Sequence, residues 1–333
     1  MKKIMLILLT ILLASCTEKG SKKVSELKEV NVGYVDVTGS GLLSDTTGIA
    51  RDKGFFDEEF AKIGVKLNLI PMTGAGPAIN EALASGSLDL GTLGDVPAVL
   101  GKANGVDTKI VSYSDLSGGA SVIAGKGTPY KSILDLKGKT IATQRGAFMH
   151  RALANLLAEA GLTFNDINFV NVNAQTASEM LVTGNVDACV VGGVTLTRLY
   201  EQGYNIVVDY RGNPLLVTGG ATIARTKFVE ENPIAVQAFV TALARARKYA
   251  IENRDALKDQ WKSTGESGDS YEYLYPEHNN YPTIARTPAS LKNFQNTLQF
   301  LLDYNLITED RKFSIEDWYD GRFAEKALKE IEK

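Results

Sequence analysis

A nine-residue pattern that occurs twice is the feature that most constrains how this chain can fold. Residues 81–89 read EALASGSLD and residues 179–187 read EMLVTGNVD. In each copy a helical stretch ends, a glycine follows, and an aspartate precedes an apolar run. A glycine directly after a helix suits a left-handed C-terminal cap, so each copy predicts a helix–glycine–strand joint. Such joints occur throughout α/β proteins, but a matching Glu, Leu, Gly and Asp in one frame favour two similarly built lobes.

The rest of the chain fits an α/β architecture. Short apolar runs alternate with helical patterns, which predicts largely parallel sheets with helices packed on them. We expect one lobe over residues 29–114 and 220–333 and a second lobe over residues 115–219. The chain would then cross between the lobes twice, near residues 112–119 and 215–220. Long helices are predicted over residues 228–253, 288–304 and 315–332.

The N-terminus has the features of an export signal. Two lysines precede an apolar run over residues 4–13, which is too short to span a bilayer. Residues 13–16 read LASC and look like a bacterial lipobox, in which Cys16 receives a diacylglycerol and becomes the new N-terminus. We therefore expect a lipoprotein signal peptide over residues 1–15 and a flexible tether over residues 16–28. The alternative is a cleaved signal with an unmodified cysteine nearby.

The composition argues against several classes of function. The chain has 36 basic and 39 acidic residues, with no basic patch that would suit nucleic acid. Cys189 lies in an apolar run and is expected to be a buried small hydrophobe. His150 and His278 are the two histidines, and neither has a partner at metal-ligand spacing. We expect no metal, no cofactor and no nucleophilic catalytic triad.

Nine short motifs occur in one order along the chain. They lie at residues 50–56 (ARDKGFF), 74–77 (GAGP), 81–91, 94–97 (GDVP), 135–142 (DLKGKTIA), 146 and 150, 161–162, 184–188, and 228–232. In their number, order and spacing the chain resembles the periplasmic solute-binding proteins of the aliphatic sulfonate, nitrate and taurine type. The resemblance implies the type II periplasmic binding protein fold, with two α/β lobes, a two-strand hinge and ligand in the cleft.

The resemblance also implies the partners and the location of the protein. An ABC permease and its ATPase would receive the ligand, and a hinge motion would close the lobes around it. With the lipid on Cys16, the protein would be a monomer in the cell envelope, anchored to a membrane and facing the periplasm or the exterior. Two alternatives stay open: an enzyme of the vitamin or quinone biosynthesis type on the same fold, and a ligand-sensing surface lipoprotein.

The ligand is expected at loops that lead from strands into helices. In open α/β sheets ligands lie beyond the carboxyl ends of strands, where helix N-termini favour anions. Five loops with small residues fit this description. Their candidate ligand-binding residues are Thr38, Gly39, Ser40 and Gly41; Gly74, Ala75 and Gly76; Asp95; Arg145, Gly146, Ala147 and Phe148; and Gly192, Gly193 and Thr195.

Two charged residues among these have alternative roles. Arg145 follows an apolar strand and precedes a helix, so it is either a bidentate clamp on a carboxylate or sulfonate, or a solvated loop residue. Asp95 either recognises a ligand amine or caps the helix that Pro97 helps to start, and we favour the cap.

Two departures from the resembling family affect the expected substrate. Ala147 stands where those proteins often have serine, and residues 192–195 (GGVT) replace an aromatic-containing element. The expected solute is therefore small and anionic or heterocyclic, with its identity open. A group of tyrosines that includes Tyr271 and Tyr273 is either a stacking surface for a flat ligand or a packed surface loop.

Overall fold

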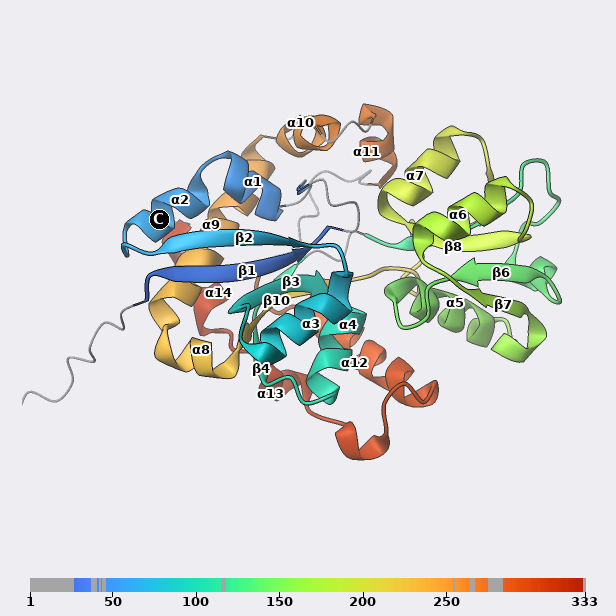
Figure 1. Ribbon diagram of the computed structural model, residues 1–333. Coiled ribbons are helices and arrows are strands. Elements are labelled where there is room, and N and C mark those ends of the chain that lie inside the picture. Colours follow the sequence, from blue (N-terminus) through green and yellow to red (C-terminus); the bar gives the residue numbers. More distant parts are fainter. Residues whose placement is uncertain are drawn as a thin grey trace, which may run out of the picture.

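The computed structural model describes residues 27–36, 41, 43, 46–114, 118–253, 255–263, 267–274 and 284–331 (Figure 1). The proposed signal peptide, Cys16 and most of the tether lie outside these residues. The strands are β1 (Glu29–Val35), β2 (Lys66–Met72), β3 (Leu90–Gly94), β4 (Thr108–Ser114), β5 (Ala120–Ala124), β6 (Thr140–Thr143), β7 (Asn168–Asn171), β8 (Ala188–Gly192), β9 (Asn205–Val208) and β10 (Gly220–Arg225).

The α-helices cover both faces of the two sheets that these strands form (Figure 1). They are α1 (Thr46–Asp52), α2 (Phe55–Ala61), α3 (Ala75–Ser85), α4 (Asp95–Ala103), α5 (Phe148–Glu159), α6 (Ala174–Val182), α7 (Gly193–Glu201), α8 (Thr226–Glu231), α9 (Pro233–Glu252), α10 (Asp255–Ser263), α11 (Gly268–Leu274), α12 (Pro288–Asp303), α13 (Ile315–Trp318) and α14 (Arg322–Ile331).

The two sheets have the same internal plan. The first has the order β2-β1-β3-β10-β4 and the second the order β7-β6-β8-β5-β9. In each sheet three parallel strands adjoin one antiparallel strand, β10 in the first and β5 in the second. Both antiparallel strands are the first ones after a passage from the other sheet. The chain therefore crosses between β4 and β5 and returns between β9 and β10.

The repeated sequence pattern forms equivalent joints in the two sheets, as predicted. The first copy runs through α3 into β3 and the second through α6 into β8. Gly86 and Gly184, which follow the helices, have φ angles of +81° and +74°. Only glycine adopts this left-handed conformation without a steric cost, which explains its place in both copies.

Two of the predicted long helices are broken into pairs. Pro233 is the first residue of α9. An N–H group at this position would have no partner within the helix, so the lack of one in proline is tolerated here and not in a helix interior. α8 and α9 are therefore separate helices. Tyr319 forms a β-bridge with Ile110 of β4, and the N–H of Asp320 donates to Ile110 O at 2.8 Å. Because its backbone pairs with a strand here, the chain cannot continue as a helix, and α13 is separate from α14.

The C-terminal part of the chain contacts both lobes. α10 packs against α1 of the first lobe, whereas α11 packs against α7 of the second (Figure 1). Tyr271 and Tyr273 lie on α11 and are buried, so they are not part of a surface loop. The proposed division of the chain places residues 220–333 in the first lobe. Apart from α10, however, the main helical neighbour of α11 is α7, which belongs to the second lobe.

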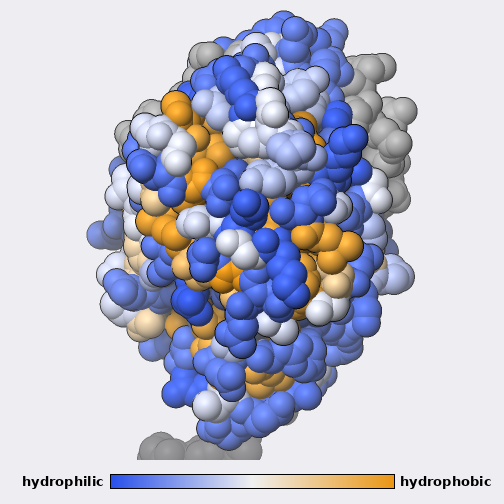
Figure 2. All heavy atoms as spheres, turned by 90° about the vertical axis from the view of Figure 1, so that its right-hand side faces the viewer, coloured by the Kyte–Doolittle hydropathy of each residue, from blue (hydrophilic) through white to orange (hydrophobic). Residues whose placement is uncertain are grey.

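The surface of the second lobe is mostly hydrophilic. Figure 2 looks onto this end of the molecule and shows small separate hydrophobic areas among polar residues. Leu134 and Val182 are exposed apolar side chains of this lobe, and single residues of this kind are common on protein surfaces. Within the described ranges, no helix has the length and apolar character needed to cross a membrane.

Candidate functional site

Four helices begin at the carboxyl ends of parallel strands and lack a side-chain cap. α3, α4, α5 and α7 follow β2, β3, β6 and β8, and none has a capping hydrogen bond from the side chain of its N-cap residue. In contrast, α6, α12 and α13 are capped by Asn173, Thr287 and Ser314. The N–H groups of an uncapped first turn need other partners, and the helix dipole makes an anion a suitable one.

The N-terminus of α4 is closed by the protein itself. The N–H of Asp95 donates to Gly219 O at 2.9 Å, and Asp95 Oδ1 accepts from the N–H of Val96 at 2.7 Å. Asp95 is fully buried, and its Oδ2 lies 2.7 Å from Arg151 Nη2 and accepts from Asn293 Nδ2 at 2.6 Å. Gly94 is the N-cap of α4, so Asp95 is not the cap that the sequence predicted; as the first residue of the helix it accepts a hydrogen bond from the next N–H instead. Its carboxylate is occupied, so ligand recognition by Asp95 is not supported.

In the first lobe, the loop before α3 remains as a candidate. Gly74 is exposed and Ala75 is half-buried, with Ala75 at a φ of +52°. Gly76 is buried, and a Cβ atom at this position would lie 2.3 Å from Pro97 Cβ. Gly76 therefore allows the close approach of α3 to α4, while Gly74 and Ala75 present backbone at the surface.

In the second lobe, the loops before α5 and α7 meet. A Cβ atom on Gly192 would lie 2.5 Å from Gly119 O and 2.9 Å from Phe148 Cζ. The half-buried Phe148 ring thus covers the space that a side chain at position 192 would take. Gly146, Ala147 and Thr195 are half-buried and Gly193 is exposed, so backbone of both loops is accessible.

Arg145 is exposed and stacks on an aromatic ring of the edge strand. Its guanidinium carbon lies 5.0 Å from the centroid of Phe169 on β7, and its backbone N–H donates to Asn171 Oδ1 at 2.8 Å. Next to it, the N–H of Gly146 donates to Nδ1 of the buried His150 at 3.3 Å. Burial, and then the charge of Arg145, lowers the pKa of His150 to about 4. This imidazole is therefore neutral and acts as a hydrogen-bond acceptor for the loop.

The fifth loop lies largely outside the described residues, including Thr38, Gly39 and Ser40, which stay predictions. Its end at Gly41 is held by two side chains that the sequence reasoning missed. Asp36 Oδ2 accepts from the N–H of Gly41 at 2.6 Å, and Arg51 Nη1 donates to Gly41 O at 2.9 Å. Burial, followed by the charge of Asp36, raises the pKa of the neighbouring Tyr34. Arg51 belongs to the ARDKGFF motif, which was the available signal.

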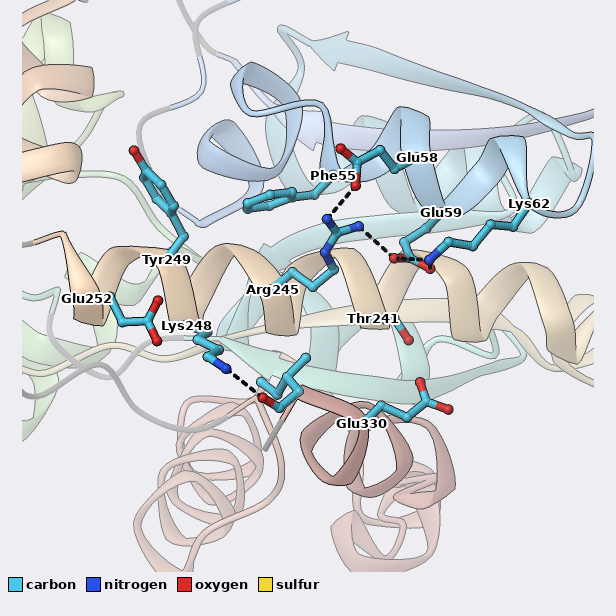
Figure 3. Close-up of a pocket in the computed structure, with 11 residues that line it drawn as sticks. Phe55, Glu58, Glu59, Lys62, Thr241, Arg245, Lys248, Tyr249, Glu252 and Glu330 are labelled. Carbon is cyan, nitrogen blue, oxygen red and sulfur yellow. Dashed lines mark hydrogen bonds and ion pairs between the residues drawn. The ribbon is translucent and has the colours of Figure 1, made fainter. Parts of the chain in front are cut away.

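A groove elsewhere in the first lobe has no free cationic group of the kind an anion site needs. It has a volume of about 510 Å³ and lies between α2, α9 and α14 (Figure 3). Arg245 pairs with Glu58 and, at 2.7 Å, with Glu59, which also binds Lys62 at 2.7 Å. Lys248 donates to Ile331 O at 2.8 Å. Because these cations already have partners in the protein, the strand-end loops remain the better candidate site. No group of residues suited to a metal ion occurs in the part of the chain that the structure describes.

Comparison with known proteins reveals extended similarity. The family model described as NMT1/THI5 like matches residues 46–256, more than half of the chain. A protein of Bacillus subtilis named as aliphatic sulfonates-binding is 28% identical over 99% of this chain and 98% of its own length. A crystal structure titled as a periplasmic sulfonate-binding protein SsuA, from Methylobacillus flagellatus, is 27% identical with a TM-score of 0.80. The match covers 92% of this chain and 95% of that one. The expected two-lobed fold of periplasmic binding proteins is confirmed.

The same fold is also found in an enzyme. The desulfurization enzyme DSZB matches 91% of this chain and 99% of its own, with a TM-score of 0.74 and 16% identity. At this identity the likeness concerns the fold alone. The similarity in sequence over nearly the full length is to binding proteins.

Proposed function

The chain belongs to the NMT1/THI5-like family, and from this premise we propose that it is the substrate-binding component of an ABC importer. It captures a small anionic solute in the cleft between its lobes, and sulfonates are the first candidates. The observation that carries this proposal is the end-to-end similarity to sulfonate-binding proteins in sequence and in structure. A ligand that contacts both lobes would stabilise the closed arrangement and not the open one, so ligand binding would drive closure.

The geometry of the loops supports an anionic ligand. The uncapped first turns of α3, α5 and α7 come from both lobes and offer backbone N–H groups. Arg145 adds a cation beside the N-terminus of α5. Asp36 and Asp95, two acidic residues within or beside the candidate loops in the sequence, are buried and hydrogen-bonded within the protein. Among the described residues of these loops, accessible backbone N–H groups and the Arg145 cation favour sulfonate or carboxylate over an amine.

Titration calorimetry of the purified chain tests this proposal. Ethanesulfonate, taurine, nitrate and propionate are the ligands, and at least one sulfonate should bind more tightly than propionate. Arg145→Ala should weaken binding of that sulfonate about tenfold, the effect of losing one charge-assisted hydrogen bond. Lys131→Ala, which removes an exposed lysine elsewhere in the same lobe, is the matched control and should leave affinity unchanged.

The outcomes of this titration separate the alternatives. If no anion binds, capture of an anionic solute is wrong. Equal affinity in wild type and Arg145→Ala removes Arg145 from the site. A product of new mass after incubation with a bound sulfonate would favour an enzyme on this fold over a binding protein.

We also propose that the protein is a monomer held at a membrane by lipid on Cys16. The LASC pattern at residues 13–16 supports this anchor, and two or more acyl chains give stable attachment. The permease and ATPase of an importer would be its partners. Metabolic labelling with palmitate should mark the wild-type chain and not Cys16→Ser, and equal labelling of both would contradict the anchor.

A further inference from the structure

A buried ion pair joins the two lobes at the N-terminal turns of α4 and α5, two of the helices that begin at the strand-end loops. Asp95 begins α4, which follows β3 of the first sheet, and Arg151 lies on α5, which follows β6 of the second. Arg151 Nη2 is 2.7 Å from Asp95 Oδ2, and the two side chains are 5% and 0% exposed. The pair therefore links helices of different lobes and is almost entirely shielded from solvent.

Two further segments converge on the same carboxylate. From α12, Asn293 Nδ2 donates to Asp95 Oδ2 at 2.6 Å and Thr297 Oγ1 at 3.3 Å. From the crossing that leads to β10, Thr218 Oγ1 donates to Asp95 Oδ1 at 3.4 Å. Arg151 Nη2 also donates to Val217 O of that crossing at 3.0 Å. One carboxylate thus holds together both lobes, a hinge segment and the helix packed beside them.

Stability alone does not explain this arrangement. A buried ion pair is often no more stabilising than apolar side chains of the same volume, because both charges lose their hydration. Arg151 Nε is buried and has no hydrogen-bond partner among the described residues, so the network is also incompletely satisfied. What a charged network offers over an apolar contact is a defined geometry.

The geometry it defines is that of the candidate site. Arg151 lies one turn beyond Ala147 and Phe148, at the start of α5, and Asp95 lies at the start of α4, against Gly219 of the crossing. A shift of Arg151 relative to Asp95 would move the loop before α5 relative to the first lobe. Contacts on a ligand from both lobes depend on that relation.

We propose that Asp95 and Arg151 are positioning residues for ligand capture, forming the pivot about which the lobes close. The pair stays formed in the open and the closed state, and it restricts the lobes to one path between them. This inference rests on the proposed binding function, since a pivot matters where closure captures a ligand.

The test measures the distance between the lobes with and without a ligand. Spin labels are placed at Ala84→Cys on α3 and Val182→Cys on α6, both exposed, in the full chain carrying Cys16→Ser. The remaining thiol, Cys189, is fully buried. Double electron–electron resonance spectroscopy then gives the distribution of distances between the two labels. Calorimetry with ethanesulfonate gives the affinity for that ligand.

Arg151→Met should broaden the distribution in the absence of ligand and weaken ethanesulfonate binding at least tenfold. Arg225→Met is the matched control, because Arg225 pairs with Asp89 at 2.6 Å within the first lobe. Both substitutions should lower the Tm, because each leaves a carboxylate without its partner. Arg225→Met should nevertheless leave the distance distribution and the affinity for ethanesulfonate unchanged. The double variant Asp95→Asn with Arg151→Met has no unpaired buried charge, so its Tm should recover relative to Arg151→Met while the distribution stays broad.

A narrow, wild-type distribution in folded Arg151→Met would overturn the pivot, as would equal broadening in Arg225→Met. Recovery of the narrow distribution together with the Tm in the double variant would also overturn it, because the pair would then act through stability alone. If wild type does not bind ethanesulfonate but Arg151→Met still broadens the distribution, the ligand assignment fails and the pivot stands.

Discussion

The helix–glycine–strand joints of the two lobes use the same backbone device with different side-chain partners. Asp89 and Asn31 exchange two hydrogen bonds, with Asp89 Oδ2 accepting at 2.9 Å and the Asp89 N–H donating at 2.8 Å. Asp187 and Thr140 exchange the same two, both at 2.9 Å. Each aspartate therefore fixes the start of its own strand against the neighbouring parallel strand.

The remaining oxygen of each aspartate distinguishes the lobes. Asp89 Oδ1 pairs with Arg225 Nη2 at 2.6 Å, at the end of the antiparallel strand β10. Asp187 Oδ1 accepts from Tyr130 Oη at 3.4 Å, in the segment after the antiparallel strand β5. The repeat thus preserves the backbone contact in both lobes. In the first lobe the aspartate also forms an ion pair with Arg225.

Alanine substitution of the two aspartates should show the largest difference between the joints. Asp89→Ala leaves the partly buried Arg225 without its counter-ion and should lower the free energy of unfolding by about 3 kcal/mol. Asp187→Ala removes hydrogen bonds but no ion pair and should cost about 1 to 2 kcal/mol. Urea unfolding of both variants measures this. Equal losses would mean that the Arg225 pair adds nothing and that the joints are energetically equivalent.

The sequence predicts these joints because the information is local. The helical periodicity before Gly86 and Gly184 and the apolar run after each aspartate lie within a few residues of one another. The same is true of the α/β alternation and of the loops at strand ends. The break at Pro233 was also readable, since proline favours the first turn of a helix over its interior.

The interlobe network could not be predicted in this way. Arg151 is 56 positions and Asn293 is 198 positions from Asp95, and no pattern in the sequence pairs them. Each residue lies within an ordinary helical stretch, so periodicity predicts its helix but not its partner. The distinction between a ligand-binding and a buried Asp95 depends on these long-range contacts. α10 and α11 were missed because they are short, although Leu257 and Trp261 do share one helical face.

A pH titration would sharpen the comparison, because the described part of the second lobe contains a buried histidine. His150 packs against Phe164 and Phe169, against Phe300 of α12, and against Tyr304, the residue that directly follows α12. Its pKa is lowered from 6.5 to about 4, so the unfolded chain takes up a proton that the folded chain refuses. The stability is complete above pH 6.5 and falls as the pH drops toward 4, by up to about 3 kcal/mol.

His150→Asn isolates this contribution from that of the carboxylates. The variant keeps an acceptor for the N–H of Gly146 but does not titrate. Its free energy of unfolding should therefore decline less than that of wild type between pH 7 and pH 4, in parallel urea titrations. Parallel declines would mean that His150 is as easily protonated in the folded chain as in the unfolded one.

The glycines of the two joints should give the smallest effect and the most equal one. Gly86→Ala and Gly184→Ala each place a Cβ atom on left-handed backbone, which costs about 1 kcal/mol. A Cβ on Gly184 meets no atom within 4 Å, and one on Gly86 meets Arg225 Nη1 at 3.8 Å, an ordinary contact. Thermal unfolding should thus show similar falls in Tm for both variants. A much larger fall for Gly86→Ala would show that the added methyl disturbs the pair of Arg225 with Asp89, which would tie the glycine of the first joint to the charge that the second joint lacks.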